Sequence, residues 1–262
     1  MLKKRIVPKL LIRHRQVGRS MRPVLVTTRG YTETIEVGDP VSQAKIYEAQ
    51  MADELIVLNI DGTPIGGDEM MLDLIARLAS ETFMPLAVGG GVRTVEDFGT
   101  LLGSGADKVS VNQAALENPA LIGEAAGRYG AQVVVVSIDY RTVEGAPQVF
   151  VDSASKPTGR TPQEWAKEAV SRGAGEILLT NADRDGMGSG LDIDIAREIA
   201  DSVDVPLILS GGCGLGAHFA AGFIDGGAEA VAAGTYFCFR DQNPFQARSH
   251  IANAGVPIRM EV

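Results

Sequence analysis

Glycine-rich turns recur at matching places in the two halves of this 262-residue chain. Gly89-Gly90-Gly91 ends one apolar run, and Ser210-Gly211-Gly212 ends another. Glycine lets backbone N–H groups point at an anion with no side chain in the way. Each half therefore predicts one phosphate site, and together they predict a ligand with a phosphate at each end. The alternative is that these glycines only permit tight turns.

Further donors for each phosphate site follow the next apolar run in the chain. These are Asn112 with Gln113 in the first half, and Gly234 with Thr235 in the second. A helix that begins at such a place adds free backbone N–H groups to an anion site.

Carboxylates also follow apolar runs, as acid/base groups in the mouth of a barrel should. Asp139, Asp183 and Asp185 are examples. A carboxylate in such a place can have a raised pKa and transfer protons near neutral pH. We expect a catalytic role for Asp139, and a role for Asp185 in proton transfer or substrate anchoring. The alternative is that such aspartates cap loops or pair with Arg141 and Arg184.

Four charged residues stand at the beginning of apolar runs instead of at the end. They are Arg5, Glu54, Lys108 and Glu176. Two bases and two acids near one barrel axis could form a closed, mutually paired ring. Charges at this end of a barrel are usually structural, so spacing alone favours a structural ring.

An internal repeat determines how these residues are positioned. Asn59 matches Asn181 and Asp61 matches Asp183, so the copies lie about 122 residues apart. Such a unit is too long for a solenoid repeat and is half of a barrel of about 250 residues. We therefore predict a (β/α)8 TIM barrel of two duplicated half-barrels, about 1–130 and 131–262, in a single domain, 1–262.

Strand and helix ranges follow from the alternation of short apolar runs with longer amphipathic ones. The expected strands are 5–11, 54–60, 85–88, 107–111, 133–139, 176–181, 206–210 and 229–233. The expected helices are 39–51, 68–80, 94–104, 118–128, 161–172, 192–202, 215–225 and 243–254. Asp39-Pro40 and Thr161-Pro162 are expected helix starts, with Glu164 completing a capping box. Residues 13–38 are expected to form a long polar connection, and 141–157 a hairpin turning at 144–147.

Composition excludes several classes of partner. A net charge of −9 and a pI of about 4.9 argue against nucleic acid. No stretch approaches the roughly 20 apolar residues of a membrane span, and the apolar run near the N-terminus is expected to be a barrel strand and not a signal peptide. Cys213 and Cys238 suggest neither a disulfide framework nor a metal site. We expect a cytoplasmic protein with no metal and no cofactor.

Several motifs together resemble the cyclase subunit of imidazole glycerol phosphate synthase, the HisF family. They are RIVPKLLI, DELIVLNID, VGGGVRTVED, GADKVSVN, VVVVSID, KPTG, GAGEILLTNADRDG and SGGCG. The resemblance covers almost the whole chain. It implies a twofold duplicated barrel that receives ammonia from a glutamine amidotransferase (glutaminase) in a heterodimer. Ammonia would cross the barrel to a phosphorylated substrate at the opposite mouth, with no cofactor or metal.

The resemblance also implies roles for individual residues. Asp139 matches one of two catalytic aspartates of the family. The implied phosphate sites are Gly90, Gly91 and Asn112, and then Asp185, Gly186, Ser210, Gly211, Gly212, Gly234 and Thr235. The implied ammonia gate is Arg5, Glu54, Lys108 and Glu176, and the implied partner interface includes Asp107 and Gln132.

One departure from the family pattern bears on function. Leu11 stands where the other catalytic aspartate should end the first strand, and the internal repeat places Leu11 opposite Asp139. Loss of one acid/base group commonly costs a factor of about 10²–10⁴ in rate. Lys9, where the family usually has a small residue, is a second departure.

A divergent branch of the family, implicated in forming amidino groups on sugars of surface polysaccharides, resembles the chain better. It also has leucine at this place. We favour that function over cyclisation in histidine biosynthesis, and a non-catalytic scaffold for the glutaminase is a further alternative.

Overall fold

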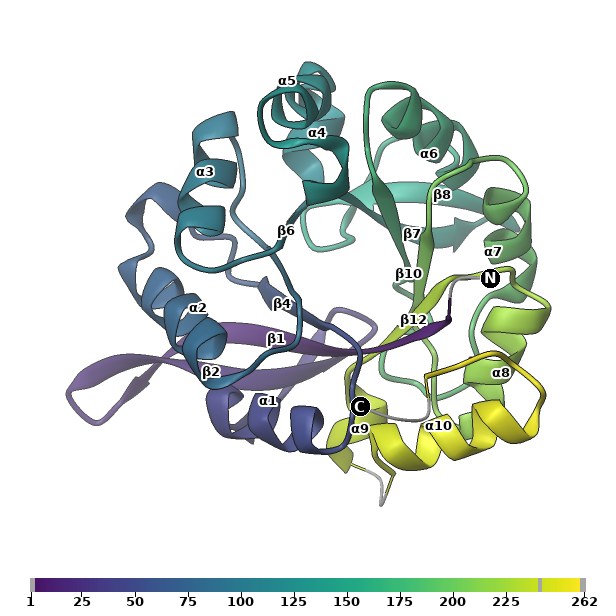
Figure 1. Cartoon of the computed structure of the whole chain (residues 1–262). Coiled ribbons are helices and arrows are strands. Elements are labelled where there is room, and N and C mark those ends of the chain that lie inside the picture. The colour runs from purple at the N-terminus through teal and green to yellow at the C-terminus, as the bar shows by residue number, and fades with distance from the viewer. Residues whose placement is uncertain (1–2, 240–241, 260–262) are drawn as a thin grey trace.

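The predicted barrel is present in the computed structural model, which describes residues 3–239 and 242–259. Residues 1–2, 240–241 and 260–262 of the expected domain lie outside the described part. Within that part, eight parallel strands close into a ring, because β12 pairs with β1 and β10 pairs with β7 (Figure 1). The ring strands are β1 (Arg5–Val17), β4 (Leu55–Asn59), β5 (Leu86–Gly89), β6 (Lys108–Val111), β7 (Val134–Val143), β10 (Glu176–Asn181), β11 (Leu207–Ser210) and β12 (Ala230–Ala233).

Helices surround the ring, as the repeat predicted (Figure 1). The longer ones are α1 (Pro40–Ala49), α2 (Glu69–Glu81), α3 (Val95–Gly103), α5 (Ala120–Tyr129), α6 (Pro162–Ser171), α7 (Ile193–Ala200), α8 (Gly216–Ile224) and α10 (Pro244–Asn253). Short helices that the sequence analysis did not delimit are α4 (Gln113–Glu117), α9 (Thr235–Phe239), and the 3₁₀ turns η1 (Ile65–Gly67) and η2 (Ala131–Val133). The first two begin at the places expected to supply extra anion donors.

Helix starts follow the predicted capping chemistry. The Thr161 hydroxyl accepts from the backbone N–H of Glu164, and the Glu164 carboxylate accepts from that of Thr161. Asp39 caps α1 in the other half by accepting from the N–H of Ser42 at 2.7 Å. These bonds satisfy N–H groups that a helix cannot pair internally.

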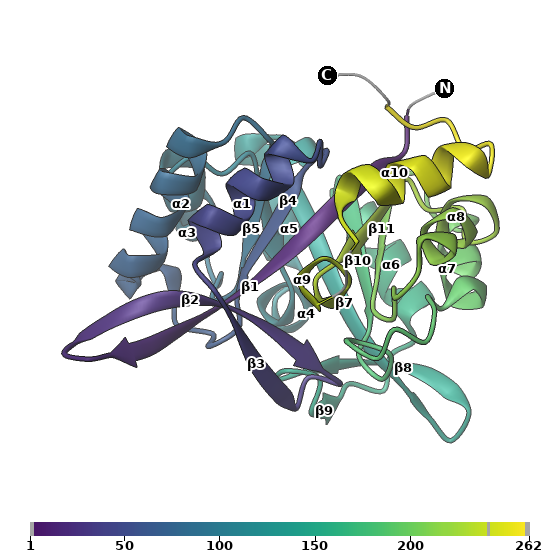
Figure 2. The same cartoon turned by 90° about the horizontal axis from the view of Figure 1, so that it is seen from below.

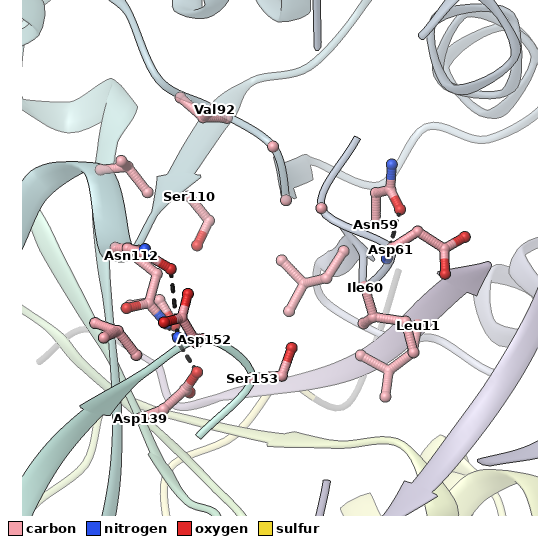
Figure 3. A pocket seen from close by; sticks show the side chains of 18 of the residues that line it. Leu11, Asn59, Ile60, Asp61, Val92, Ser110, Asn112, Asp139, Asp152 and Ser153 are labelled. Atoms are coloured by element: carbon pink, nitrogen blue, oxygen red, sulfur yellow. Dashed lines mark hydrogen bonds between the residues drawn. The ribbon is translucent and has the colours of Figure 1, made fainter. Parts of the chain in front are cut away.

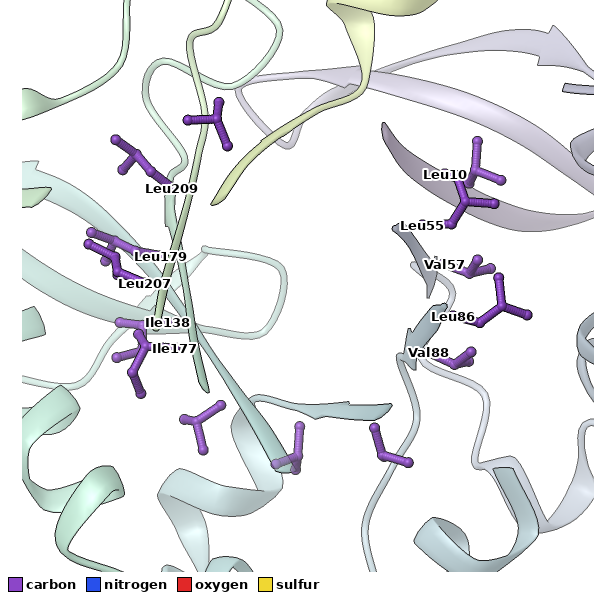
Figure 4. Packing of buried hydrophobic residues seen from close by; sticks show 14 of the residues in the cluster. Leu10, Leu55, Val57, Leu86, Val88, Ile138, Ile177, Leu179, Leu207 and Leu209 are labelled. Atoms are coloured by element: carbon purple, nitrogen blue, oxygen red, sulfur yellow. The ribbon is translucent and has the colours of Figure 1, made fainter. Parts of the chain in front are cut away.

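The strands separate two hydrophobic layers. One face of each strand packs outward against the helices, with Leu10 and Val57 on one side of the barrel and Ile138 and Leu209 on the other (Figure 4). The opposite face fills the barrel interior with small and branched side chains, which are Val7, Ile56, Ala87, Val135, Leu178, Ile208, Ala230 and Ala232. This alternation follows from the two-residue period of a strand.

The prediction of a long polar connection over 13–38 is wrong. Strand β1 continues to Val17 and pairs antiparallel with β2 (Ser20–Arg29), which pairs with β3 (Glu33–Gly38). Val24 and Val26 of β2 are buried against Leu11. Charged residues on the exposed positions hid the strand alternation, while three apolar residues in β2 were enough to anchor it.

The predicted hairpin after the fifth barrel strand is confirmed. Strand β7 turns at Glu144 and Gly145 into β8 (Ala146–Val151), and β9 (Lys156–Pro157) follows. The β2–β3 hairpin and the β8–β9 segment lie at the same end of the barrel (Figure 2). That end holds the carboxyl ends of the strands, where barrel enzymes build their active sites. Across the described residues, no helix is both long and apolar enough to cross a membrane.

Candidate active site at the barrel mouth

Equivalent hydrogen bonds in the two halves hold the loops of the mouth. In the first half, the Asn59 amide donates to Asp68 at 2.7 Å and accepts from the N–H of Asp61 at 2.9 Å. The Asp61 carboxylate in turn accepts from Arg13 at 2.9 Å and from the backbone N–H of His14 at 2.6 Å. This carboxylate therefore joins the end of β4 to the β1 extension.

The second half repeats the arrangement with equivalent residues. The Asn181 amide donates to Asp192 at 2.8 Å and accepts from the N–H of Asp183 at 3.0 Å. Asp183 accepts from Arg141 at 2.6 Å and from the N–H of Thr142 at 2.8 Å. The structural alternative considered for these strand-end aspartates is therefore correct for Asp183, which pairs with Arg141.

These paired contacts establish which residues of the halves are equivalent. Arg13 on β1 corresponds to Arg141 on β7, so Leu11 corresponds to Asp139. Leu11 is 7% exposed and packs on Val24 and Val26. One half of the mouth therefore presents a carboxylate, and the other presents a buried hydrocarbon side chain under β2.

The glycine turns also correspond between the halves, and their geometry has a structural cause. Gly90 has φ of 91° and Gly211 has φ of 89°. A Cβ at Gly90 would lie 2.0 Å from the Asn59 carbonyl oxygen, and one at Gly211 would lie 2.4 Å from that of Asn181. Close backbone approach thus demands glycine at both places. Because both turns follow parallel strands of one ring, they open at the same end.

A pocket of about 860 Å³ occupies the mouth over the first half. Gly90, Gly91, Asn112 and Asp139 line it together (Figure 3). The side chains of Asn112 and Asp139 lie on one side of this pocket and Leu11 on the other. The structure thus brings the first predicted phosphate turn and the predicted catalytic carboxylate to one cavity.

The residues of the second predicted phosphate site do not line this pocket. The residues concerned are Asp185, Gly186, Ser210, Gly211, Gly212, Gly234 and Thr235. Gly186 is placed against β2 instead, where an added Cβ would lie 2.0 Å from the Thr28 carbonyl oxygen. The β2 strand, absent from the sequence-based prediction, therefore packs close to Gly186.

Asp139 is 9% exposed and has a partner on each carboxylate oxygen. Tyr31 donates to Oδ1 at 2.9 Å, and Asn112 donates to Oδ2 at 2.8 Å. Burial raises the pKa of Asp139, while the Tyr31 hydrogen bond and the charge of Lys9 act to lower it. A carboxylate with a raised pKa that lines a pocket can accept and return a proton near neutral pH.

Asp185 is buried beside a lysine that points into the barrel. Lys9 Nζ lies 3.5 Å from Asp185 Oδ1 and donates to Ser210 Oγ at 3.1 Å. The Thr28 hydroxyl donates to Asp185 Oδ2 at 2.5 Å. The Asp185 carboxylate is thus committed to Lys9 and to the β2 strand, which suits positioning better than contact with a ligand in the pocket.

The four charges at the opposite end form the closed ring that the sequence suggested. Arg5 pairs with Glu54 at 2.6 Å and also with Glu176, while Lys108 pairs with Glu54 at 3.0 Å and with Glu176 at 2.8 Å. Both glutamates are buried. Burial by itself lowers the pKa of Arg5, but the charges of Glu176 and Glu54 outweigh burial and the pKa is raised.

Small and branched apolar side chains fill the barrel between the charged ring and the mouth. Ala87, Ala230 and Ala232 belong to this interior layer. Above it, Lys9, Ser110 and Ser137 line the floor of the pocket. Along the barrel axis, a charged ring is therefore followed by an apolar layer and then by a polar pocket.

Exposed groups surround the charged end of the barrel. Asp107 precedes β6 and accepts from the N–H of Leu86 at 2.8 Å, and Gln132 precedes β7. Both residues are exposed, as a role in a partner interface would require. Phe83, which precedes β5 at the same end, is 98% exposed.

Among the residues that the structure describes, no group of three or more His, Cys, Asp or Glu side chains could hold a metal ion.

Sequence reasoning missed Tyr31 and Thr28 as site residues. Both lie in the segment 13–38, which was expected to be a polar connection, so no strand pattern singled out their side chains. Lys9 was noticed only as a departure from the family pattern. Its position at an inward-facing place of β1, two residues from Val7, could have identified it as a barrel-interior cation.

The fold and the site define a duplicated (β/α)8 barrel with a charged ring at one end and an acid-containing pocket at the other. Comparison with known proteins identifies the family of this chain. A family model described as histidine biosynthesis protein matches residues 5–243. A protein of Prochlorococcus marinus (strain MIT 9313), named "Putative imidazole glycerol phosphate synthase subunit hisF2", is 49% identical over 262 residues, covering 100% of both chains. The chain belongs to the histidine biosynthesis protein family and is a HisF-type member of it.

Proposed function

We propose that this chain is the ammonia-accepting synthase subunit of a glutamine-dependent heterodimer, acting on a phosphorylated substrate. The observation that supports this most strongly is the pairing of a closed charged ring at one end with the Asp139 pocket at the other. In the proposal, ammonia released by a glutaminase enters past Arg5, Glu54, Lys108 and Glu176. It then crosses the apolar layer to the substrate.

Within that function we favour amidino-group formation on a sugar over imidazole ring closure. Leu11 carries this preference, because leucine cannot exchange a proton and the equivalent place in the other half holds Asp139. Ammonia would attack the activated acyl carbon of an acetamido group, and the new C–N bond would form as the bond to the activating group breaks and that group leaves. No ring closes, so a single carboxylate suffices. Asp139 would take the proton that the attacking nitrogen loses.

The Gly90–Gly91 turn is the place proposed to bind a phosphate group of the substrate. Both glycines line the pocket, and helix α4 begins beside it at Gln113. Backbone N–H groups and the helix end together favour an anion at this place. The Ser210–Gly212 turn would take a second anionic group only from outside this pocket.

The partner is proposed to dock on the charged end, where Asp107, Gln132 and Phe83 are exposed. An aromatic side chain that is almost fully exposed is a common anchor of protein interfaces. Phe83→Ala should weaken association with the glutaminase and leave turnover with free ammonium unchanged. Equal affinity of the Phe83→Ala variant and the unaltered chain for the glutaminase would remove Phe83 from the interface.

The histidine-pathway cyclase is the second candidate, favoured by the name of the Prochlorococcus relative. Expression of this chain in a histidine auxotroph that lacks its cyclase separates the two. We expect no growth without histidine, whereas an authentic cyclase gene in the same vector restores growth. Robust rescue would defeat the sugar-amidination proposal in favour of the histidine pathway.

Catalysis itself is tested with purified protein and ammonium chloride. The substrates are the histidine-pathway bisphosphate and an acyl-activated acetamido sugar. Asp139→Asn should reduce product formation at least about 100-fold, because it removes the base. Retained turnover in this variant would exclude Asp139. No product from the unaltered chain with either substrate would favour the remaining alternative, a non-catalytic scaffold for the glutaminase.

A further inference from the structure

The turn between β2 and β3 is fixed over the mouth from two sides. The backbone N–H of Gly30 donates to the Asp185 carbonyl oxygen at 2.8 Å, and Arg141 donates to the Gly30 carbonyl oxygen at 2.8 Å. Tyr31 follows with φ of 65°, a left-handed conformation that is uncommon for an aromatic residue. Such conformations cost on the order of 1–3 kcal/mol and persist where the surroundings impose them, often at functional sites.

The conformation directs the Tyr31 side chain into the pocket. Its ring lines the cavity, and its hydroxyl donates to Asp139 Oδ1 at 2.9 Å. With Asn112 on Oδ2, the two hydrogen bonds fix the plane of the Asp139 carboxylate. The second half of the chain thus supplies the acid, and the β2–β3 turn of the first half supplies one of its two orienting groups.

We propose that Tyr31 is a positioning residue for Asp139, holding the carboxylate in its ionised, pocket-facing orientation. This inference rests on the proposed function, in which Asp139 accepts a proton from the attacking nitrogen. The β2–β3 hairpin thus has two contacts at the mouth: β2 buries Leu11, and the turn after β2 supports Asp139.

Several other charged and polar groups surround Asp139. Lys9 on β1 acts to lower the Asp139 pKa, and Asp185 after β10 acts to raise it. Asn112 after β6 donates the other hydrogen bond, and Asp152 from the β8–β9 turn lines the same pocket.

The Tyr31 phenol is itself protonated at neutral pH. Burial, and then the charges of Asp139 and Asp185, raise the pKa of Tyr31 well above its ordinary value. The phenol therefore remains a donor to the carboxylate at neutral and alkaline pH.

The test is a carboxyl carbon NMR titration of protein labelled with [4-¹³C]aspartate, with Asp139→Asn used to assign the resonance. Tyr31→Phe keeps the ring and deletes only the donor. We expect the Asp139 pKa to rise by on the order of one pH unit in this variant. Tyr129→Phe, on α5 away from the mouth, is the matched control and should leave the Asp139 titration unchanged. An unchanged Asp139 titration in Tyr31→Phe would overturn the proposal.

A kinetic experiment distinguishes a positioning role of Tyr31 from a purely structural one. With the substrate accepted in the assays above, the acidic limb of the pH–rate profile should move upward in Tyr31→Phe by the same amount as the NMR midpoint. The Michaelis constant for ammonium should not change. A displaced NMR midpoint with an unmoved rate profile would reduce Tyr31 to a structural residue and sink the proposal.

Failure of the proposed function is distinguishable from failure of this inference. If the unaltered protein turns over neither substrate, the function falls, while the NMR titration still decides the role of Tyr31. Should Tyr31→Phe not fold, unaltered protein labelled at tyrosine Cζ replaces it. The Tyr31 resonance should then step at the Asp139 midpoint, and a resonance that does not respond would contradict the contact.

Discussion

Leu11 and Asp139 occupy equivalent places in the two half-barrels, yet their surroundings differ. Leu11 lies under β2 with Val24 and Val26. Asp139 faces the pocket with Tyr31 and Asn112 as donors. The two equivalent places therefore differ in polarity: one is apolar and packed on β2, and the other is hydrogen-bonded in the pocket.

Restoring an acid at this place should cost stability. We expect Leu11→Asp to lower the free energy of unfolding by about 2–4 kcal/mol at pH 8, because a carboxylate would replace a buried side chain among apolar neighbours. Urea unfolding measures this loss, with Leu11→Asn as the uncharged control. A buried acid with a raised pKa is tolerated better as pH falls. The excess cost of Asp over Asn should therefore shrink toward pH 4.5, and a growing excess would contradict the burial argument.

Removing the buried Asp139 carboxylate should increase stability, whereas introducing one at Leu11 should reduce it. Its pKa is raised, chiefly by burial, so the ionised side chain costs stability above its unfolded pKa of about 3.9 and costs nothing well below it. Asp139→Asn is expected to increase the free energy of unfolding at pH 8, with a smaller gain at pH 4.5. Urea unfolding at the two pH values checks this, with exposed Asp73→Asn on α2 as the control. A gain that is larger at pH 4.5 would be inconsistent with the raised pKa.

At the scale of elements, the β2–β3 hairpin depends on one glycine outside it. Gly186 has φ of 71°, and a Cβ there would lie 2.0 Å from the Thr28 carbonyl oxygen of β2. The contact lets the Thr28 hydroxyl reach Asp185. Gly186, which the family resemblance assigns to phosphate binding, thus also packs against β2.

Gly186→Ala should therefore displace β2. Alanine at Gly145, where φ is 82° and no atom lies within 4 Å, is a matched control that adds backbone strain alone, about 1 kcal/mol. We expect Gly186→Ala to destabilise the protein by at least about 2 kcal/mol more than this control. Amide hydrogen exchange should also speed up in Ser20–Arg29. Equal losses of stability in the two variants would show that the close packing of Gly186 on β2 does not contribute to stability.

At the scale of the whole molecule, the charged ring joins the two half-barrels. Arg5, Glu54 and Lys108 come from the first half, and Glu176 comes from the second. Removing one member of a buried charge cluster leaves its partners uncompensated, which is why such losses are large.

Arg5→Met is expected to destabilise the protein by about 3 kcal/mol. Glu176→Gln in the same chain should recover at least about 1 kcal/mol of the summed single effects. A double-mutant cycle by urea unfolding measures this coupling. The exposed pair Lys45 and Glu81, 2.7 Å apart, is the comparison and should show no measurable coupling. Absence of coupling in the ring would mean that its members act independently.

The sequence by itself determined the barrel, its duplication, the positions of the longer helices around it and the end at which each charged group lies. Those features follow from local rules: strand and helix periodicity, capping residues, and parallel strands that place all carboxyl ends together. It also predicted the residues of the charged ring, since alternation along a strand puts Arg5 and Glu54 on the inner face.

Only the tertiary structure decided how the mouth is completed. The β2–β3 hairpin has few apolar residues of its own and becomes a strand pair by packing on Leu11 and pairing with β1. The contacts of Tyr31 with Asp139, and of Lys9 with Asp185, join residues that are distant in sequence. No local pattern encodes such contacts, because they depend on backbone approaches, as at Gly186, that exist only after the ring has closed.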